Sequence, residues 1–167
     1  MKDLTHASAG ALVGAAVCLA AGCPVVGAVV GGIAAMIPDL DMPTSGIGRR
    51  FPYLSSLIHG AFGHRKHFHT VYACAAISLL LSMIVVGLCF IFFNSSVVVF
   101  YALLACTLVS MLLGHLGLDM ATRSGLQPLH PYGPHFKWFF SDEHRHWESI
   151  MTVGFIALTI IVCIVHL

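Results

Sequence analysis

The stretch Gly114-His115-Leu116-Gly117-Leu118-Asp119 ends a long apolar run and carries a histidine and an aspartate four residues apart. On a helix, this spacing places both side chains on one face, one turn from each other. An imidazole and a carboxylate so placed can bind one divalent metal ion together. A mutual hydrogen bond between His115 and Asp119 is the simpler alternative.

The composition around this stretch is typical of a membrane protein. Of the 167 residues, 58% are hydrophobic and only 9% are charged, whereas an average soluble domain is about 25% charged. The formal net charge of +1 argues against nucleic acid as the partner. Histidine is unusually common, with 11 His against 8 Lys and Arg. The six cysteines lie in apolar runs without a CxxC pair, so we expect no thiolate zinc site.

The first apolar segment, residues 4–38, contains no Asp, Glu, Lys or Arg. One helix of this length would far overrun a bilayer core of about 30 Å. Gly22-Cys23-Pro24 interrupts the segment, so we predict two short helices, 5–21 and 24–37, that form a hairpin. The hairpin crosses the bilayer either fully or in part. Small residues four apart in both arms predict close packing, namely Gly10, Gly14, Gly27 and Gly31.

Three longer apolar segments complete the predicted fold. Asn94-Ser95-Ser96 divides residues 71–118 into 71–93 and 97–118, each long enough to span a bilayer. A last segment, 149–167, has bare spanning length. We therefore predict an all-α integral membrane protein with an N-terminal short helical hairpin plus three further transmembrane helices. With no internal repeat, residues 1–167 are expected to form one domain.

Two polar segments carry most of the charge. Residues 38–70 and 119–148 are rich in Pro and Gly, and we predict loops there, the first with a short helix at most. With a hairpin at the N-terminus, all basic residues fall on one side of the membrane, which the positive-inside rule makes cytoplasmic. These residues are Lys2, Arg49, Arg50, Arg65, Lys66, Arg123, Lys137 and Arg145.

Seven potential ligands lie where apolar segments meet that side: His6, Asp39, Asp41, His64, His69, His115 and Asp119. Ionisable residues at membrane depth are costly and are usually functional or paired. Their nitrogen and oxygen donors suit zinc, manganese, iron or nickel, and seven ligands suffice for one or two ions. We expect zinc or manganese. Simpler interpretations exist, since a histidine at a helix end can be interfacial and an aspartate after a proline can cap a turn.

The other histidines are weaker candidates. His67 would point away from its neighbours on a helix, and His59, His130 and His135 lie in predicted loops without an obvious partner. His144 and His146 lie among acidic residues and form either a patch near the site or a solvated cap.

Four short motifs occur in order along most of the chain. They are Thr5-His6 with Gly10; Pro38-Asp39-Leu40-Asp41; His64-Arg65 followed by His69; and Gly114 to Asp119 with Thr122, Gly125 and Pro128. In this pattern the chain resembles the YdjM-like, LexA-regulated inner-membrane metal-dependent hydrolases of bacteria. That family's middle motif usually reads His-Arg-Gly-x-Thr-His-Ser, whereas Lys66 replaces the Gly here and Phe68 the Thr. The ligands stay intact, but a bulky group near the pocket predicts a different substrate choice.

The predicted activity is hydrolysis of a phosphoester or ester. Because the site is expected at headgroup depth on the cytoplasmic face of the inner membrane, its location favours a lipid-like substrate. A bound metal would lower the pKa of its water towards ~7. Asp39 and Asp41 would complete a second metal, or one of them would act as general base. Arg65 would face the negative charge that develops on a substrate oxygen, or would simply anchor lipid headgroups.

Two other classes of function stay open. Intramembrane His and Asp also mark pathways for metal ions or protons, which would make the protein a transporter. A non-catalytic membrane protein could bind metal for structure or dock a partner. The oligomeric state is not predicted.

Overall fold

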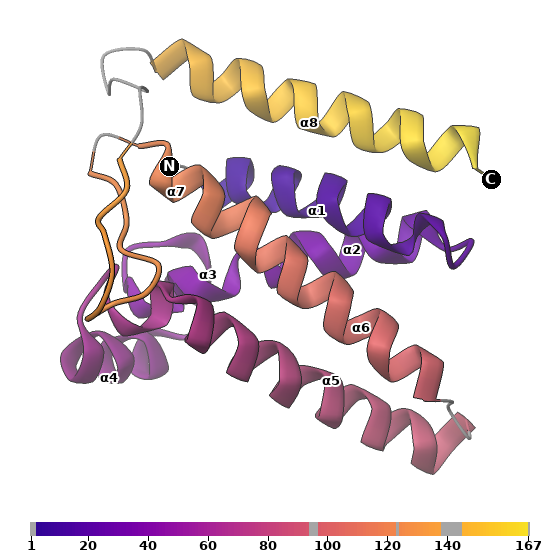
Figure 1. Cartoon of the computed structure of the whole chain (residues 1–167), viewed down its shortest axis with the longest axis horizontal. Coiled ribbons are helices and arrows are strands. Elements are labelled where there is room, and N and C mark those ends of the chain that lie inside the picture. Colours follow the sequence, from indigo (N-terminus) through magenta and orange to yellow (C-terminus); the bar gives the residue numbers. More distant parts are fainter. Residues whose placement is uncertain (1–2, 94–96, 123, 138–144, 167) are drawn as a thin grey trace.

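The computed structural model describes residues 3–93, 97–122, 124–137 and 145–166. Its regular structure is helical, and one isolated bridge joins Leu126 to Phe136. The elements are α1 (Asp3–Leu19), α2 (Pro24–Ala34), η1 (Ile37–Asp41), α3 (Gly46–Arg50), α4 (Pro52–Phe62), η2 (His67–His69), α5 (Val71–Phe93), α6 (Val97–Val109), η3 (Ser110–Leu116), α7 (Gly117–Met120) and α8 (Arg145–Val165). The predicted all-α class is confirmed (Figure 1).

The helices α1 and α2 form the predicted hairpin. Gly22, at φ +68°, lies in the turn between them, and Pro24 begins α2, where its fixed φ suits the first turn of a helix. The two backbones touch through their glycines, because a Cβ added at Gly31 would lie 2.8 Å from the Cα of Gly14. Only glycine allows this approach, so the small-residue pattern determines how the hairpin closes.

The segment from α6 to α7 is one continuous helix, Val97–Met120, with a π-helical part at Ser110–Leu116. This part packs directly on the hairpin, since a Cβ at Gly114 would lie 2.7 Å from both the Cα and the N of Gly10. Ser110 Oγ also donates to the carbonyl oxygen of Gly10 at 3.2 Å. Such π-helical turns are usually single local features inside an α-helix. The predicted apolar segment 97–118 is confirmed as helix, but its π-helical part was not predicted.

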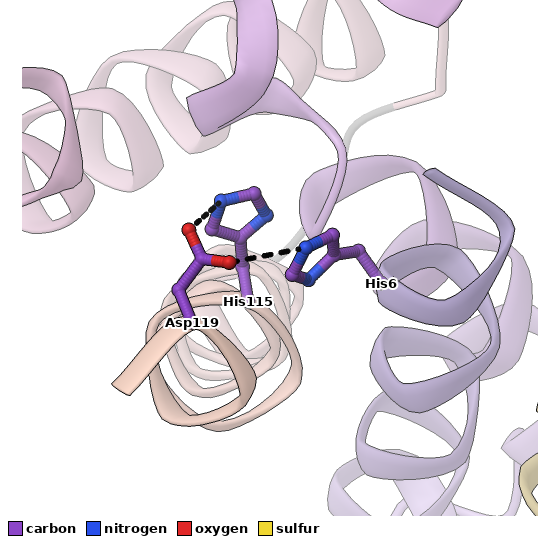
Figure 2. A group of neighbouring side chains, drawn as sticks. All are labelled: His6, His115 and Asp119. Carbon is purple, nitrogen blue, oxygen red and sulfur yellow. Dashed lines mark ion pairs between the residues drawn. The ribbon is translucent and has the colours of Figure 1, made fainter. Parts of the chain in front are cut away.

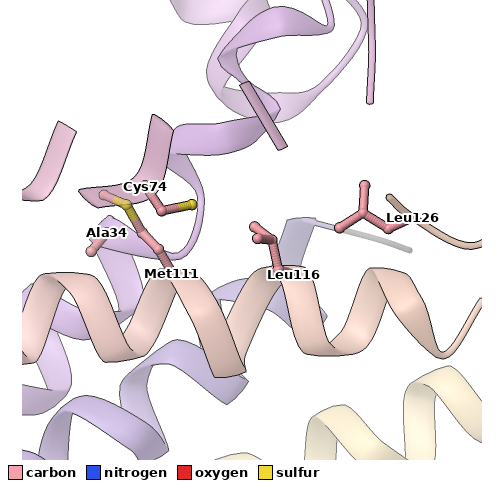
Figure 3. Close-up of a cluster of buried hydrophobic side chains, with 5 residues drawn as sticks. All are labelled: Ala34, Cys74, Met111, Leu116 and Leu126. Carbon is pink, nitrogen blue, oxygen red and sulfur yellow. The ribbon is translucent and has the colours of Figure 1, made fainter. Parts of the chain in front are cut away.

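An apolar cluster packs beside the segment that carries His115 (Figure 3). It joins side chains from α2, α5, η3 and the chain after α7. Its members are Ala34, Cys74, Met111, Leu116 and Leu126, each at most 2% exposed. The cluster therefore packs the π-helical segment against α2, α5 and the chain after α7.

Within the described part of the chain, three helical segments are long and apolar enough to cross a membrane: Pro24–Asp41, Val97–Met120 and His146–Val165. The apolar helices Asp3–Leu19 and Val71–Gly87 are shorter by the same measure, although α5 as a whole runs over 23 residues. The last helix begins at Arg145, a few residues before the apolar segment predicted at 149–167. Its apolar side chains are largely exposed, as expected for a lipid-facing helix.

The bundle has two chemically different ends (Figure 1). The N-terminus, α3, α4, α7 and the first turn of α8 lie at one end, and the C-terminus lies at the other. The elements and loops at the first end carry the six basic residues that are described, Arg49, Arg50, Arg65, Lys66, Lys137 and Arg145. Lys2 and Arg123 lie outside the described residues.

The prediction of a loop over residues 38–70 was wrong in part. This region contains α3 and the 11-residue helix α4, besides two short 3-10 turns. Pro52 stands in the first turn of α4, where proline is favourable, and Gly63 follows its end at φ +68°. The same proline and glycine content that suggested a loop therefore marks the two ends of a helix.

Candidate metal centre

Five of the predicted ligands converge at the basic end of the bundle, each from a different element. His6 comes from α1, Asp39 from η1, His69 from η2, His115 from η3 and Asp119 from α7. The three histidines are at most 1% exposed, Asp119 is 1% exposed and Asp39 is 8% exposed. Residues from both halves of the sequence thus meet in one buried cluster, which we call the inner cluster.

The donor atoms of the inner cluster have the separations of ligands around an ion. His69 Nε2 lies 3.0 Å from His115 Nε2, 3.6 Å from Asp39 Oδ1 and 3.5 Å from Asp119 Oδ2. His115 Nε2 lies 3.7 Å from each of these two carboxylate oxygens. Donors at about 2.1 Å from an ion lie about 3.0 Å apart at octahedral angles and about 3.4 Å apart at tetrahedral angles, so the residues fit a metal.

His6 joins the cluster because α1 packs so closely on η3. Its ring stacks on that of His115 with a centroid distance of 4.1 Å. Its Nε2 lies 3.5 Å from Asp119 Oδ1, and Figure 2 shows the aspartate facing both imidazoles. The contact of Gly10 with Gly114 therefore positions His6, one helical turn before Gly10, against His115.

The hydrogen bonds at Nδ1 show which nitrogen each histidine offers. His115 Nδ1 lies 2.6 Å from the carbonyl oxygen of Ala35, and His6 Nδ1 lies 3.4 Å from that of Gly114. A carbonyl oxygen can only accept, so both Nδ1 atoms carry hydrogen and both Nε2 atoms keep a lone pair when the rings are neutral. The backbone thus turns the metal-binding nitrogens inward.

His69 follows the same rule with a carboxylate as its partner. Its Nδ1 lies 3.1 Å from Asp41 Oδ2, which leaves Nε2 facing the inner cluster. Burial alone would lower the pKa of His69, but its hydrogen bonds with Asp39 and Asp41 and the charge of Asp119 raise that pKa to about 9. The local negative charge that favours a proton here would equally favour a divalent cation.

One oxygen of the cluster has no ordinary partner. Among the described residues, Asp119 Oδ2 is buried and accepts no hydrogen bond. Leaving a buried carboxylate oxygen unpaired is costly. A cation between Asp119, His69 and His115 would remove this cost, which is a second observation in favour of a metal.

The remaining predicted residues, Asp41, His64 and Arg65, surround the inner cluster. Asp41 is fully buried, and its Oδ1 lies 2.7 Å from His64 Nδ1. Its Oδ2 also accepts from the backbone N–H of Arg65 at 3.2 Å. The sets His6–His115–Asp119, Asp39–His69–His115 and Asp41–His64–His69 each have donors within 4.8 Å of one another, so Asp41 and His64 belong to the outermost of three overlapping groups.

Arg65 links the turn after α4 to the end of α7. Its Nη2 donates to Asp119 Oδ1 at 3.0 Å, and its Nη1 donates to Thr122 at 3.5 Å and to Ser124. The residue has a φ of +57°, which is uncommon outside glycine and costs on the order of 1 kcal/mol or more. Its contacts with Asp41 and Asp119 hold this conformation. The role of Ser124 was not predicted, because no motif marks a serine in a loop.

A polar cavity of about 340 Å³ opens beside the cluster. Asp39, His64 and Arg65 line it together with Asp3, Met42, Thr44 and Ser45. Of the inner cluster, only Asp39 reaches the wall. The cavity therefore reaches one edge of the cluster at Asp39 and leaves the three inner histidines covered.

The other histidines lie outside the inner cluster. His59 was predicted to lie in a loop without an obvious partner, but it belongs to α4 and its Nδ1 lies 2.8 Å from the carbonyl oxygen of Asp41. His130 also has partners, with Nδ1 3.2 Å from Gln127 Oε1 and its ring 5.1 Å from that of His67. His146 is exposed in the first turn of α8, and His144 lies outside the described residues.

The fold and the cluster define a class: a multi-pass helical membrane protein whose buried histidines and aspartates can hold a metal ion at one end of the bundle. The whole chain, residues 1–167, matches the YdjM inner membrane protein family, and the chain belongs to this family. It is therefore an inner-membrane protein, as predicted.

Comparison with curated proteins gave one relative. The chain is 34% identical over 108 residues to the uncharacterized protein YvsG of Bacillus subtilis (strain 168). The aligned part covers 65% of this chain and 59% of the relative's own length. No solved structure matches the chain.

Proposed function

We propose that this protein is a metal-dependent hydrolase that binds one divalent ion, zinc or manganese, through His6, Asp39, His69, His115 and Asp119. One observation carries the proposal: three buried imidazoles turn Nε2 towards two carboxylates, because their Nδ1 atoms are engaged elsewhere. His115 is shared by the sets His6–His115–Asp119 and Asp39–His69–His115. Because its Nδ1 is engaged by Ala35, only Nε2 is free to bind a metal. We therefore favour one ion shared by both sets over two separate ions.

The chemistry proposed is attack of water on a phosphoester or ester. The metal would supply a water of lowered pKa and would polarise the substrate oxygen. Asp39 joins the cavity to the inner cluster and would orient the substrate there. Arg65, already held by Asp119, would face the oxygen on which negative charge develops.

The location of the cavity favours a lipid-like substrate. The basic end of the bundle, which carries the cavity, would face the cytoplasm by the positive-inside rule. At that depth a headgroup can reach the cavity while its chains stay in the bilayer. We propose that residues 1–167 work as one unit, because the ligands come from α1 through α7.

Transport of ions fits this arrangement less well. A transporter needs polar sites near mid-membrane, but residues 71–114 contain no Asp, Glu, Lys, Arg or His. The described cluster lies at one end of the bundle instead. A structural metal site without catalysis remains the alternative that experiment has to separate, and the cavity beside the cluster favours catalysis.

The proposal is tested with His115→Ala and Asp119→Ala. Removal of either donor should lower bound metal from about one ion per chain to a small fraction, since loss of one ligand weakens an already shared site. Hydrolysis of phospholipid and of chromogenic phosphodiesters should fall in parallel. Elemental analysis of the detergent-purified protein and product release measure the two effects.

The exposed His146 provides the matched control, because His146→Ala removes an imidazole without touching the cluster. If the two cluster variants keep both the metal and the hydrolysis of the parent, the assignment is wrong. If they lose metal and fold while the parent shows no hydrolysis, the site is structural.

A further inference from the structure

We propose that His64 and Asp41 form a proton-transfer pair at the edge of the metal centre, with His64 as the acid–base residue and Asp41 as the residue that positions it. The inference rests on the proposed hydrolase function and assigns a role to two residues of the same site. From the sequence, His64 was predicted to be a metal ligand, and Asp41 either a metal ligand or a general base.

Asp41 has little capacity left to bind a metal. Its Oδ1 accepts from His64 Nδ1 at 2.7 Å, and its Oδ2 accepts from His69 Nδ1 at 3.1 Å and from the N–H of Arg65 at 3.2 Å. Three of its roughly four lone-pair positions are therefore occupied, and the residue is fully buried. Moreover, Asp41 contacts the Nδ1 edge of His69, whereas the inner cluster lies at the Nε2 edge. An ion held there would be separated from Asp41 by the ring of His69.

His64 differs from the inner histidines in its exposure. Its side chain is 26% exposed, compared with at most 1% for His6, His69 and His115. It lines the cavity together with Asp39 and Arg65. Since Nδ1 is engaged by Asp41, the hydrogen on that atom leaves a lone pair on Nε2. The ring thus stands between a buried carboxylate and the space available to a substrate.

The local backbone places His64 in this position. Helix α4 ends at Phe62, and Gly63 at φ +68° turns the chain. The N–H of Arg65 is then anchored by Asp41, and Arg65 has a φ of +57°. This turn presents the side chains of His64 and Arg65 to the same cavity, one as a base and the other as a fixed positive charge.

In the proposed step, His64 carries one proton from the attacking water to the leaving oxygen. A water oxygen forms a new bond to the phosphorus or carbonyl carbon, and His64 Nε2 takes the proton that this water releases. The bond to the leaving oxygen then breaks, and Nε2 returns the same proton to that oxygen. One water is consumed and one acid and one alcohol are formed. Asp41 stays ionised, holds the tautomer and stabilises the protonated ring.

A matched pair of substitutions tests the assignment. Asparagine places its amide nitrogen near the position of Nδ1, so His64→Asn and His69→Asn can both keep a donor to Asp41 while both lose Nε2. His67→Asn is the control, because His67 is exposed in the same segment and packs against Phe62 and His130 instead. Bound zinc is measured by elemental analysis, and hydrolysis with a chromogenic phosphodiester and a chromogenic carboxylic ester.

We expect His64→Asn to keep about one zinc per chain while its hydrolysis falls about 100- to 10,000-fold. His69→Asn should lose zinc, and His67→Asn should keep both properties. Added imidazole should restore part of the activity of His64→Ala, because a free imidazole can carry the missing proton. Asp41→Asn should change the tautomer of His64, which its ring nitrogen shifts in ¹⁵N NMR spectra report.

Three outcomes would overturn the inference. If His64→Asn loses zinc as His69→Asn does while the parent is active, His64 is a ligand and the proposed function stands. If His64→Asn keeps zinc and full activity, it transfers no proton. If the parent holds zinc but hydrolyses neither ester class, the proposed function and the proton-transfer pair both fall.

Discussion

At the scale of single residues, the ability of a histidine to bind the metal depends on which ring nitrogen faces the inner cluster. The motifs predict which residues gather, and the structure brings all seven to the same end of the bundle. They could not predict which nitrogen faces inward, because that is decided by the carbonyl oxygens of Ala35 and Gly114. Any residue type provides such an oxygen, so no sequence pattern marks it.

The same reasoning explains why Asp41 and His64 were grouped with the ligands. In sequence, Asp39 and Asp41 are equivalent carboxylates after Pro38. In the structure, Asp39 Oδ1 faces the inner nitrogens, whereas Asp41 contacts the outer edge of His69. The two carboxylates therefore differ in which edge of His69 they contact. This difference arises only when η1 and η2 pack together.

At the scale of elements, glycines decide how closely the helices approach. The small residues of α1 and α2 predicted the tight hairpin, which is confirmed. The contact of Gly114 with Gly10 was not predicted, because a single glycine in an apolar run carries no pairing information. The π-helical segment was missed for a similar reason, since its hydrogen bonding depends on the packing of η3 against α1.

Gly114→Ala tests this contact. An added Cβ would lie 2.7 Å from the backbone of Gly10, so η3 would have to move away from α1, which also moves His115 from His6. We expect a loss of about 1–3 kcal/mol in the free energy of unfolding and a reduced zinc content. Thermal unfolding in detergent and elemental analysis measure these effects.

The control is Gly154→Ala in α8, where an added Cβ meets no described atom within 4 Å. There the alanine should leave zinc content unchanged and slightly favour the helix. Equal behaviour of the two variants would show that the close contact of α1 with η3 does not determine the site.

At the scale of the whole molecule, charge determines orientation. The described basic residues lie at the end that carries the cluster and its cavity, and the apolar helices point away from it (Figure 1). The order of apolar and polar segments was enough to predict this arrangement. The helices α3 and α4 were not predicted, because proline and glycine occur both in loops and at helix ends.

The orientation predicts which residues a reagent can reach from each side. Arg50 and His166 are both exposed, and they lie at opposite ends of the bundle. A membrane-impermeant thiol reagent should therefore label Arg50→Cys only in inside-out vesicles and His166→Cys only in intact spheroplasts. The parent protein is the control for background labelling, because its Cys23, in the turn between α1 and α2, and its Cys163 are only partly buried. Labelling of Arg50→Cys from outside would reverse the orientation and place the cavity on the other face.

X-ray absorption of the zinc-loaded protein tests the central claim most directly, because it reports the ligands of the bound ion without depending on a substrate. We predict about one zinc per chain, with nitrogen and oxygen neighbours at about 2.0–2.2 Å and the outer-shell scattering of three imidazoles. That scattering should decrease in His6→Ala and persist in His64→Asn. A spectrum with sulfur at about 2.3 Å, or a protein that retains neither zinc nor manganese, would contradict the account.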